Sequence, residues 1–171
     1  MNIVLTGFMA SGKTEVSKAV AAMSKYKLID TDEMIEEKEG MSINEIFELH
    51  GEEYFRRSEH ECVCRAAAMD NMVIATGGGV VLNKKNIEAL RKNGIIFNLA
   101  PDFEVIEERL AGAAATRPLL REGGLEDVRR RFNDRLPYYA DCDCSVHVIK
   151  GRTPQSYALE ILAEMEGKKI K

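Results

Sequence analysis

The sequence predicts an α/β fold in three layers, with a parallel sheet of five strands between two layers of helices. Five apolar runs of strand length recur along the chain, at residues 2–6, 27–30, 72–76, 94–99 and 145–149. Their uninterrupted apolar character is typical of strands buried on both faces of a parallel sheet. Helical patterns separate these runs, and this alternation favours right-handed crossovers between parallel strands. Ligands of such a fold gather at the carboxyl ends of the strands.

The intervening segments have helical periodicity, and two of them begin with recognisable caps. Ser42 is followed three residues later by Glu45, which is the spacing of a capping box. Thr153 precedes Pro154, a cap followed by a proline of the first helical turn. We expect helices at residues 12–25, about 32–39, 42–50, 52–69, 83–92, 102–111, 125–136 and 154–166.

Length and composition predict one domain over residues 1–171 and exclude several classes of protein. A chain of 171 residues with 45% hydrophobic residues suits a single core. The net charge of -4 argues against binding to nucleic acid, which usually needs a basic surface. The sequence shows no run of about 18 apolar residues and no signal peptide before the first strand, so we expect a cytoplasmic protein that does not bind membranes.

Cysteine and histidine spacing predicts no metal site. The four cysteines form two Cys-x-Cys pairs, whereas zinc and redox sites favour Cys-x-x-Cys. We expect reduced thiols without a metal or disulfide role. The histidines show neither ligand nor triad spacing, and surface or satisfied core positions are the simpler interpretation for His50, His60 and His147.

The segment "GFMASGKT" (7–14) carries the strongest functional signal, because it lies directly between the first strand and the first helix. It matches the phosphate-loop pattern G-x-x-x-x-G-K-[ST] in the strand, loop and helix context that the motif requires. Its glycines let backbone amides surround phosphate oxygens, Lys13 reaches the β and γ phosphates, and Thr14 offers a hydroxyl to Mg²⁺. The Asn-Lys-x-Asp signature of GTP switches is absent, and the chain has little room for motor insertions. A small kinase is therefore favoured.

Two acids follow the second strand in "IDTDEM", and they admit two interpretations. In an extended chain, Asp30 and Asp32 point the same way, so one carboxylate is able to hold magnesium through water while the other orients an attacking hydroxyl. Alternatively, Asp30 with Glu33 is a capping box. Beside a phosphate loop, the interpretation as a catalytic site is favoured.

The segment "GEEYFRRSEHE" predicts one arginine that faces a pocket. Because successive helical residues diverge by about 100 degrees, Arg56 and Arg57 cannot both face the same pocket. Glu59 lies on the face of Arg56 and is able to orient its guanidinium for bidentate capture of a carboxylate. An ordinary surface ion pair is the alternative for Arg56.

Three further segments bear on the site. In "ATGGGVV" (75–81), the glycines allow backbone amides to approach a small ring, and a tight turn between strand and helix is a compatible interpretation. The segment 111–124, "AGAAATRPLLREGG", has small residues around Arg117, as a mobile lid over the γ phosphate needs. In "DVRRRFNDRLPYY", residues 129–131 form a solvated face, whereas Arg135 lies near a helix end before Pro137.

Taken together, these segments resemble the shikimate kinase family. The resemblance rests on "GFMASGKT", "DTDEMIE", "GEEYFRRSE", "TGGGVV", "TRPLL" and "RLPYY", in that order over most of the chain. It implies transfer of the γ-phosphoryl group of Mg-ATP to the 3-hydroxyl of shikimate, in aromatic amino-acid biosynthesis. It also implies a fold like that of nucleoside monophosphate kinases, with strand order 2-3-1-4-5. We expect a monomer whose partners are the two substrates alone.

The resemblance also implies roles for individual residues. Asp32 would contact shikimate and act as the base, and Asp30 and Thr14 would serve the Mg²⁺. Acceptor binding would fall to a region at about 32–60 and to residues beyond it, with the contacts Asp32, Arg56, Gly78 and Arg135 and with Glu59 as support for Arg56. Lys13 and Arg117 would stabilise the transferring group. ATP would be held by Gly7, Ala10, Ser11, Gly12, Lys13, Thr14, Glu15, Arg117 and Arg152, the last of these beside the adenine.

One residue departs from the family pattern. The family commonly has glycine where this chain has Ala10. A methyl group is tolerated there if the residue has a negative φ, and we therefore expect little loss of ATP binding.

Other functions remain to be weighed against this one. The nearest enzyme alternatives are gluconate kinase and nucleoside monophosphate kinase, and the alternative from another class is a noncatalytic nucleotide-binding regulator. The combination of Asp32, Arg56 and Arg135 favours a compact polyol with a carboxylate over a nucleotide. The presence of base, clamp and lid disfavours the regulator.

Overall fold

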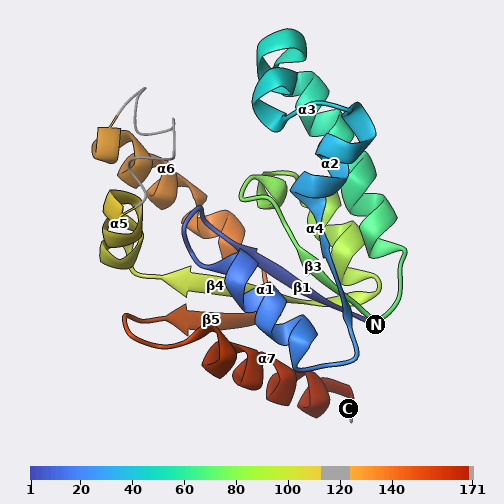
Figure 1. The fold of residues 1–171 in the computed structure, drawn as a ribbon, viewed down its shortest axis with the longest axis vertical. Coiled ribbons are helices and arrows are strands. Elements are labelled where there is room, and N and C mark those ends of the chain that lie inside the picture. The colour runs from blue at the N-terminus through green and yellow to red at the C-terminus, as the bar shows by residue number, and fades with distance from the viewer. Residues whose placement is uncertain (113–123, 170–171) are drawn as a thin grey trace.

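The computed structural model describes residues 1–112 and 124–169, and its centre is a parallel sheet of five strands (Figure 1). The strands are β1 (Asn2–Gly7), β2 (Lys27–Asp30), β3 (Met72–Ala75), β4 (Gly94–Pro101) and β5 (Cys144–Val148). Their order is β2-β3-β1-β4-β5, and every neighbouring pair is parallel. The predicted strands and the strand order are confirmed.

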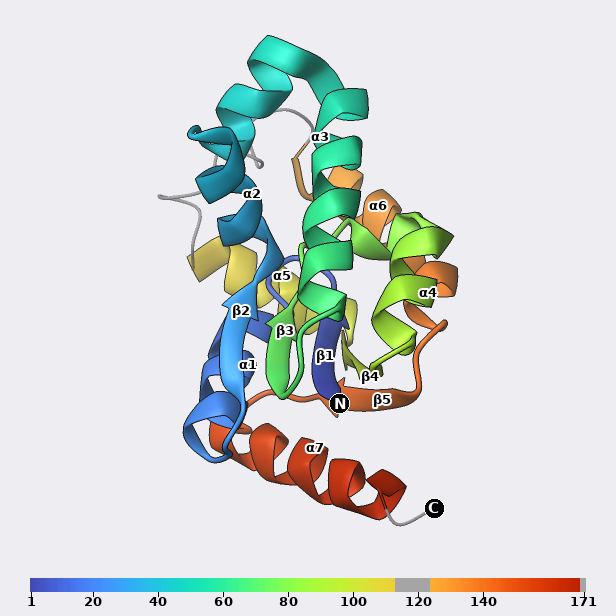
Figure 2. The same ribbon diagram turned by 90° about the vertical axis from the view of Figure 1, so that its right-hand side faces the viewer.

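Helices cover both faces of the sheet, as Figures 1 and 2 show from two directions. They are α1 (Lys13–Ala22), α2 (Thr31–Glu39), α3 (Ile43–Ala67), α4 (Lys84–Arg91), α5 (Phe103–Gly112), α6 (Gly124–Tyr139) and α7 (Pro154–Lys169), with a 3-10 turn η1 (Val80–Leu82). Each segment expected to be helical overlaps one of these helices, and the segments 42–50 and 52–69 together correspond to α3.

The core divides into two apolar clusters because side chains alternate across each strand. Ile3 and Leu5 of β1 pack with α1 and α7 on one face, where Val16 and Tyr157 are buried. Val4 packs on the opposite face, against the helices from α2 to α6. Burial on both faces explains why the strands read as continuous apolar runs.

Local chemistry sets the ends and bends of the helices around the site. The Ser42 hydroxyl accepts from the Glu45 amide at 3.3 Å, and Glu45 Oε2 accepts from the Ser42 amide at 2.8 Å, which confirms the capping box. Gly51 has φ 78° and ψ 176°, so α3 bends between its two expected halves. The expected end of α6 before Pro137 is wrong, because the helix continues to Tyr139. A proline so near the end removes only one intrahelical bond, and Ala140 still donates to Leu136 at 3.1 Å.

The histidines and cysteines play local structural parts. The four cysteines are free thiols. His60 Nδ1 lies 2.6 Å from Asn86 Oδ1, His50 stacks on Tyr54, and exposed His147 lies 3.3 Å from Asp102. No helix in the described part of the chain is both long and apolar enough to cross a membrane.

Candidate active site

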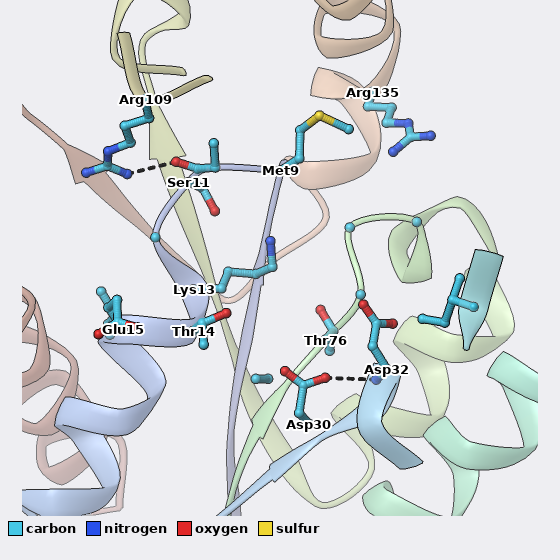
Figure 3. Close-up of a pocket in the computed structure, with 18 of the residues that line it drawn as sticks. Met9, Ser11, Lys13, Thr14, Glu15, Asp30, Asp32, Thr76, Arg109 and Arg135 are labelled. Atoms are coloured by element: carbon cyan, nitrogen blue, oxygen red, sulfur yellow. Dashed lines mark hydrogen bonds between the residues drawn. The ribbon is translucent and has the colours of Figure 1, made fainter. Parts of the chain in front are cut away.

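A cavity of about 830 Å³ opens where β1, β2 and β3 end. This is the position that a parallel α/β sheet offers to ligands. Figure 3 shows Lys13 and Thr14 of α1 together with Asp30 and Asp32, which come from the end of β2 and the start of α2. The cations that line the cavity are Lys13, Arg56, Arg109, Arg135 and Arg152.

The phosphate loop, residues 7–14, occupies one side of the cavity. Gly7 and Gly12 have φ values of 151° and 98°, and Gly12 is the N-cap of α1. The N-terminus of α1 faces the cavity, because Gly12 and the first turn of the helix line it. Lys13 Nζ donates to the carbonyls of Gly7 at 2.5 Å and of Phe8 at 3.0 Å. The ammonium group is thus held over the loop, where the phosphates of a nucleotide would lie.

Ala10 adopts a different conformation from the one expected. Its φ is 59°, so the condition of a negative φ is not met, and the residue occupies the left-handed region that favours glycine. The strain costs on the order of 1–2 kcal/mol for a residue with a side chain. Arg109 helps to impose this shape, because its Nη1 donates to the Ala10 carbonyl at 2.9 Å. Arg109 was not predicted as a site residue, since its partner lies 99 residues away in the chain.

Asp30 and Asp32 both line the cavity, but by a different geometry from the expected one. Asp30 ends β2 and caps α2, where its carboxylate accepts from the Asp32 amide at 2.8 Å. Asp32 belongs to the first turn of α2, not to an extended strand. The cap uses the Asp32 amide, so the predicted capping box with Glu33 is wrong. Capping and a position in the cavity are nevertheless compatible for Asp30.

Asp32 has the electrostatics of a general base. Burial raises the pKa of its carboxyl to about 6, with further upward contributions from Asp30 and Glu59, while Lys13 lowers it. A carboxylate with a pKa close to physiological pH accepts a proton more readily than an ordinary surface aspartate. The raised pKa is therefore compatible with a proton-accepting role for Asp32.

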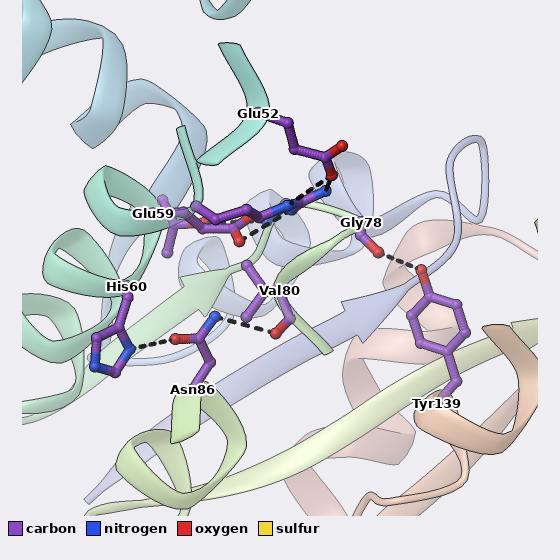
Figure 4. A network of polar contacts seen from close by, with 10 residues as sticks. Glu52, Glu59, His60, Gly78, Val80, Asn86 and Tyr139 are labelled. Carbon is purple, nitrogen blue, oxygen red and sulfur yellow. Dashed lines mark hydrogen bonds and ion pairs between the residues drawn. The ribbon is translucent and has the colours of Figure 1, made fainter. Parts of the chain in front are cut away.

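Arg56 is fixed by two acids on its own helix, Glu52 and Glu59, which Figure 4 labels. Its Nη1 lies 3.1 and 3.0 Å from the two oxygens of Glu59, and its Nη2 lies 3.2 Å from Glu52. Only 2% of the Glu59 side chain is exposed, and burial raises its pKa against the lowering effect of Arg56. Arg57, which lies on another face, is 66% exposed and pairs with Glu53. Arg56 lines the cavity and Arg57 does not.

Two glycines in the loop that follows β3 leave space for the side chains of Asp32 and Arg56. We call residues 76–80 the acceptor loop. A methyl group on Gly77 would overlap the Asp32 carboxylate, and one on Gly79 would overlap the Arg56 guanidinium. Gly78 lies between them and would meet only ordinary van der Waals contacts. The sequence indicated close approach of a ligand to these glycines but did not reveal their contacts with Asp32 and Arg56.

Arg135 reaches the cavity from α6, four residues before Tyr139. Its guanidinium carbon lies 5.8 Å from the centre of the Phe8 ring. Tyr139 donates its hydroxyl hydrogen to the Gly78 carbonyl at 2.6 Å. Tyr139 was likewise not predicted as a site residue, although "RLPYY" contains it.

The far end of the cavity has the residues expected near a nucleotide base. Arg152 forms an ion pair with Glu160 at 2.6 Å and lies 4.4 Å from the centre of the Tyr157 ring. Pro154 lies beside it in the lining. Glu15, an exposed residue, forms an ion pair with Lys18 at 3.4 Å. Arg117 and nearly all of the expected lid lie outside the described residues, although Ala111 and Gly112 end α5 and Gly124 begins α6.

The donor set fits a hard cation that keeps much of its water. Thr14 and Asp30 supply a hydroxyl and a carboxylate to the same cavity. Within residues 1–112 and 124–169, no group of three or more His, Cys, Asp or Glu side chains is arranged to hold a metal. Mg²⁺ is commonly held by one or two carboxylates together with phosphates and waters, so this sparse set is compatible with it.

Comparison with known proteins gives a consistent result. A family model described as "Shikimate kinase" matches residues 9–166. Proteins named shikimate kinase from Caldicellulosiruptor bescii and from Caldanaerobacter subterraneus subsp. tengcongensis are each 46% identical to the chain. The first match covers 85% of each chain and the second 94%.

Solved structures agree with the sequence matches. The shikimate kinase from Acinetobacter baumannii, determined in complex with shikimate, superposes with a TM-score of 0.89. It is 31% identical, and the match covers 99% of this chain and 95% of that one. Together with the phosphate loop and the acids and arginines that share its cavity, these matches show that the chain belongs to the shikimate kinase family.

Proposed function

We propose that the chain, a shikimate kinase by family, uses Asp32 as the base and Arg56 and Arg135 as the carboxylate clamp for its acceptor. The observation that carries this assignment is that Asp32, Arg56, Arg135 and Lys13 line a single cavity. The cavity thus offers a base to a hydroxyl group, two guanidinium groups to a carboxylate, and an ammonium group to a phosphate.

Shikimate binding would depend on groups that are already oriented. Glu59 and Glu52 fix the Arg56 guanidinium, so little side-chain entropy is lost when a carboxylate binds. Arg135 would contact the same carboxylate from α6, and the Gly78 amide would donate to an oxygen of the acceptor. Asp32 would accept hydrogen bonds from the hydroxyl groups.

The transfer would follow the usual course of phosphoryl chemistry. The 3-hydroxyl oxygen attacks the γ phosphorus, the bond from that phosphorus to the β–γ bridging oxygen breaks, and ADP leaves. Asp32 receives the hydroxyl proton, and Lys13 neutralises charge on the transferring group. The transition state is loose, so positioning and charge neutralisation matter more than the strength of the base.

The nucleotide and its metal would occupy the β1 side of the cavity. Thr14 and Asp30 would hold Mg²⁺, Thr14 directly and Asp30 through water. When bound, the metal would neutralise charge on the β and γ phosphates. Backbone amides of the phosphate loop would surround those phosphates. The adenine ring would lie near Arg152 and Pro154, and Arg109 would lie on the side of the phosphate loop.

The remaining proposals concern organisation and setting. We propose one domain over residues 1–171, with a lid at about 111–124 that brings Arg117 to the phosphates. We also propose that the protein acts as a cytoplasmic monomer on small molecules, with no nucleic-acid or membrane partner. The net charge of -4 supports the exclusion of nucleic acid. Size-exclusion chromatography with light scattering tests the monomer.

An acceptor panel tests the proposed reaction. ADP release is measured with ATP and, in turn, shikimate, gluconate, AMP and CMP. Turnover with shikimate alone is expected. Turnover of another acceptor without shikimate would contradict the assignment, and tight ATP binding without any turnover would favour a noncatalytic regulator.

The Asp32→Asn variant tests the base. We expect kcat with shikimate to fall by about 10²–10⁴-fold, which is the usual contribution of general acid–base catalysis. ATP affinity should stay within about twofold, because Asp32 lies on the acceptor side. A variant with wild-type kcat would remove Asp32 from this role.

A further inference from the structure

The backbone of the acceptor loop is held at both ends by side chains from neighbouring elements. At its start, the Gly77 amide donates to Thr31 Oγ1 at 3.1 Å. At its end, buried Asn86 donates from Nδ2 to the Val80 carbonyl at 3.1 Å, and its Oδ1 faces His60 (Figure 4). Between these anchors lie the two peptide groups of Gly78 and Gly79.

Those two peptide groups are oriented through their carbonyl ends. The Val80 amide donates to the Gly77 carbonyl at 3.2 Å, and Tyr139 donates to the Gly78 carbonyl at 2.6 Å. In a trans peptide the N–H points opposite to the C=O, and the described chain has no cis peptide bond. The Gly78 amide is therefore fixed by the turn, and the Gly79 amide is fixed by Tyr139.

Both amides remain available as donors. Among the described residues, neither Gly78 nor Gly79 donates a backbone hydrogen bond to another protein group. Both glycines line the cavity, and neither has a side chain to cover its amide. Unsatisfied backbone donors at the wall of a cavity are groups that a ligand oxygen is well placed to satisfy.

We propose that Tyr139 is a positioning residue of the acceptor site, which holds the Gly78 carbonyl so that the Gly79 amide is presented to an acceptor oxygen beside the Gly78 amide. The inference rests on the proposed function, because it assumes that shikimate occupies this wall of the cavity. Tyr139 acts through the loop and does not itself touch the reacting atoms.

The surroundings of Tyr139 suit this part. Its residue exposure is only 4%, and its ring packs edge-on against Phe8 with ring centres 6.5 Å apart. Burial raises the pKa of the phenol to about 12, whereas the charge of Arg135 lowers it, so the hydroxyl remains a donor. Tyr139 and Arg135 lie four residues apart on α6, so they share a face of that helix. The same turn of α6 thus carries Arg135, a proposed contact of the acceptor, and Tyr139, which orients the Gly79 amide.

The Tyr139→Phe variant of the full chain tests the proposal. It keeps the ring packing and removes the hydroxyl, which bonds to the Gly78 carbonyl and also contacts Arg135. One such hydrogen bond is typically worth about 0.5–1.5 kcal/mol, or roughly 2- to 13-fold in an equilibrium constant. We expect KM for shikimate to rise about 3- to 10-fold, while KM for ATP stays within about twofold. Tyr138→Phe is the matched control, since Tyr138 is 48% exposed, and both of its KM values should equal those of the wild type.

The outcomes separate the inference from the function on which it rests. An active wild type together with a folded Tyr139→Phe enzyme of unchanged KM for shikimate would overturn the inference alone. Equal losses for both substrates would also overturn it, because they indicate general disruption. A wild type that does not phosphorylate shikimate would overturn the proposed function, and this inference with it.

A measurement on the wild-type protein gives a second test that does not depend on folding of the variant. When shikimate is added, the ¹⁵N-resolved amide resonances of both Gly78 and Gly79 should shift, while that of Gly94, at the opposite end of the sheet, should not. A shift at Gly78 without one at Gly79 would refute the part assigned to Tyr139.

Discussion

Asp32 is a half-buried carboxylate beside two other acids, so its proton is held unusually tightly. The pKa of about 6 has a direct consequence for catalysis, because only the ionised carboxylate accepts the proton of the acceptor hydroxyl. We expect kcat/KM for shikimate to fall below pH 6, to about one tenth of its plateau at pH 5. A pH profile with saturating ATP checks this. A flat profile down to pH 5 would contradict the role of Asp32.

The same pKa shift means that ionised Asp32 lowers the free energy of unfolding above about pH 6. A carboxyl whose folded pKa of about 6 exceeds the ordinary value of 3.8 favours folding when protonated, and this contribution is lost as pH rises through 6. We expect Asp32→Asn to raise the free energy of unfolding by about 1–3 kcal/mol at pH 8, with little difference near pH 4. Urea unfolding at both values measures it. Glu88→Gln, a change at an exposed carboxylate, should show no such dependence.

Gly77 and Gly79 are predicted to affect different kinetic constants. In Gly77→Ala the new methyl group would displace the Asp32 carboxylate, and a misplacement of about 1 Å is able to lower kcat by about 100-fold. In Gly79→Ala it would displace the Arg56 guanidinium, so KM for shikimate should rise about tenfold with a smaller change in kcat.

A control and a stability measurement complete this comparison. The displaced atoms are ends of side chains, so both variants should keep a melting temperature close to that of the wild type. Gly167→Ala on α7, where the methyl meets nothing within 4 Å, should leave all constants unchanged. If Gly77→Ala and Gly79→Ala gave the same kinetic defect, the separate contacts assigned to them would be wrong.

At the scale of elements, a carboxylate whose side chain is only 10% exposed helps to join α2 to α3. Glu39, at the end of α2, accepts from Tyr54 at 2.6 Å and from Ser58 at 2.5 Å and lies 3.1 Å from Lys38. The hydroxyls of Ser58 and Tyr54 and the nearby Lys38 lower its pKa to about 2. Since α2 carries Asp32 and α3 carries Arg56, this junction fixes the base relative to the clamp.

Substitution of Glu39 should therefore weaken both the fold and the acceptor site. We expect Glu39→Gln to lower the free energy of unfolding by about 1.5–3 kcal/mol at pH 7, as for hydrogen bonds to a charged group. A depressed pKa stabilises the fold above the unfolded value of 4.5 and loses this contribution as pH falls through about 2, so the difference should shrink in acid. Urea unfolding measures it, with exposed Glu37→Gln as the control. A variant as stable as the wild type at pH 7 would show that the junction does not matter.

Structural features that depend on neighbouring residues could be predicted from the sequence. Contacts between residues far apart in the chain could not. The strands followed from continuous apolar runs, and the Arg56–Glu59 pair followed from three-residue spacing on one helix. Tyr139 and Arg109 instead meet backbone carbonyls 61 and 99 residues away, contacts that only the tertiary fold creates. The same holds for Ala10, whose positive φ depends on a loop held from α5.

At the scale of the whole molecule, an acidic chain gathers cations in one place. The net charge is -4, yet among the residues that the structure describes, Lys13 and four arginines line the cavity. Two anionic substrates need such a local excess of positive charge. The cations come from different layers, because Lys13 lies on α1 whereas Arg56 lies on α3, across the sheet edge.

This division predicts that KM for shikimate and KM for ATP depend on different arginines. Arg56→Ala should raise KM for shikimate about 10- to 100-fold, the effect of losing a charge-assisted bond, with KM for ATP nearly unchanged. Arg109→Ala should raise KM for ATP about 3- to 10-fold by releasing the Ala10 carbonyl, with KM for shikimate nearly unchanged. Initial rates with each substrate varied at saturation of the other measure both constants.

Arg57→Ala, next to Arg56 but 66% exposed, is the matched control and should behave as the wild type. If Arg56→Ala raised KM for shikimate and KM for ATP equally, Arg56 would have a general structural effect on the cavity and no specific part in binding the acceptor.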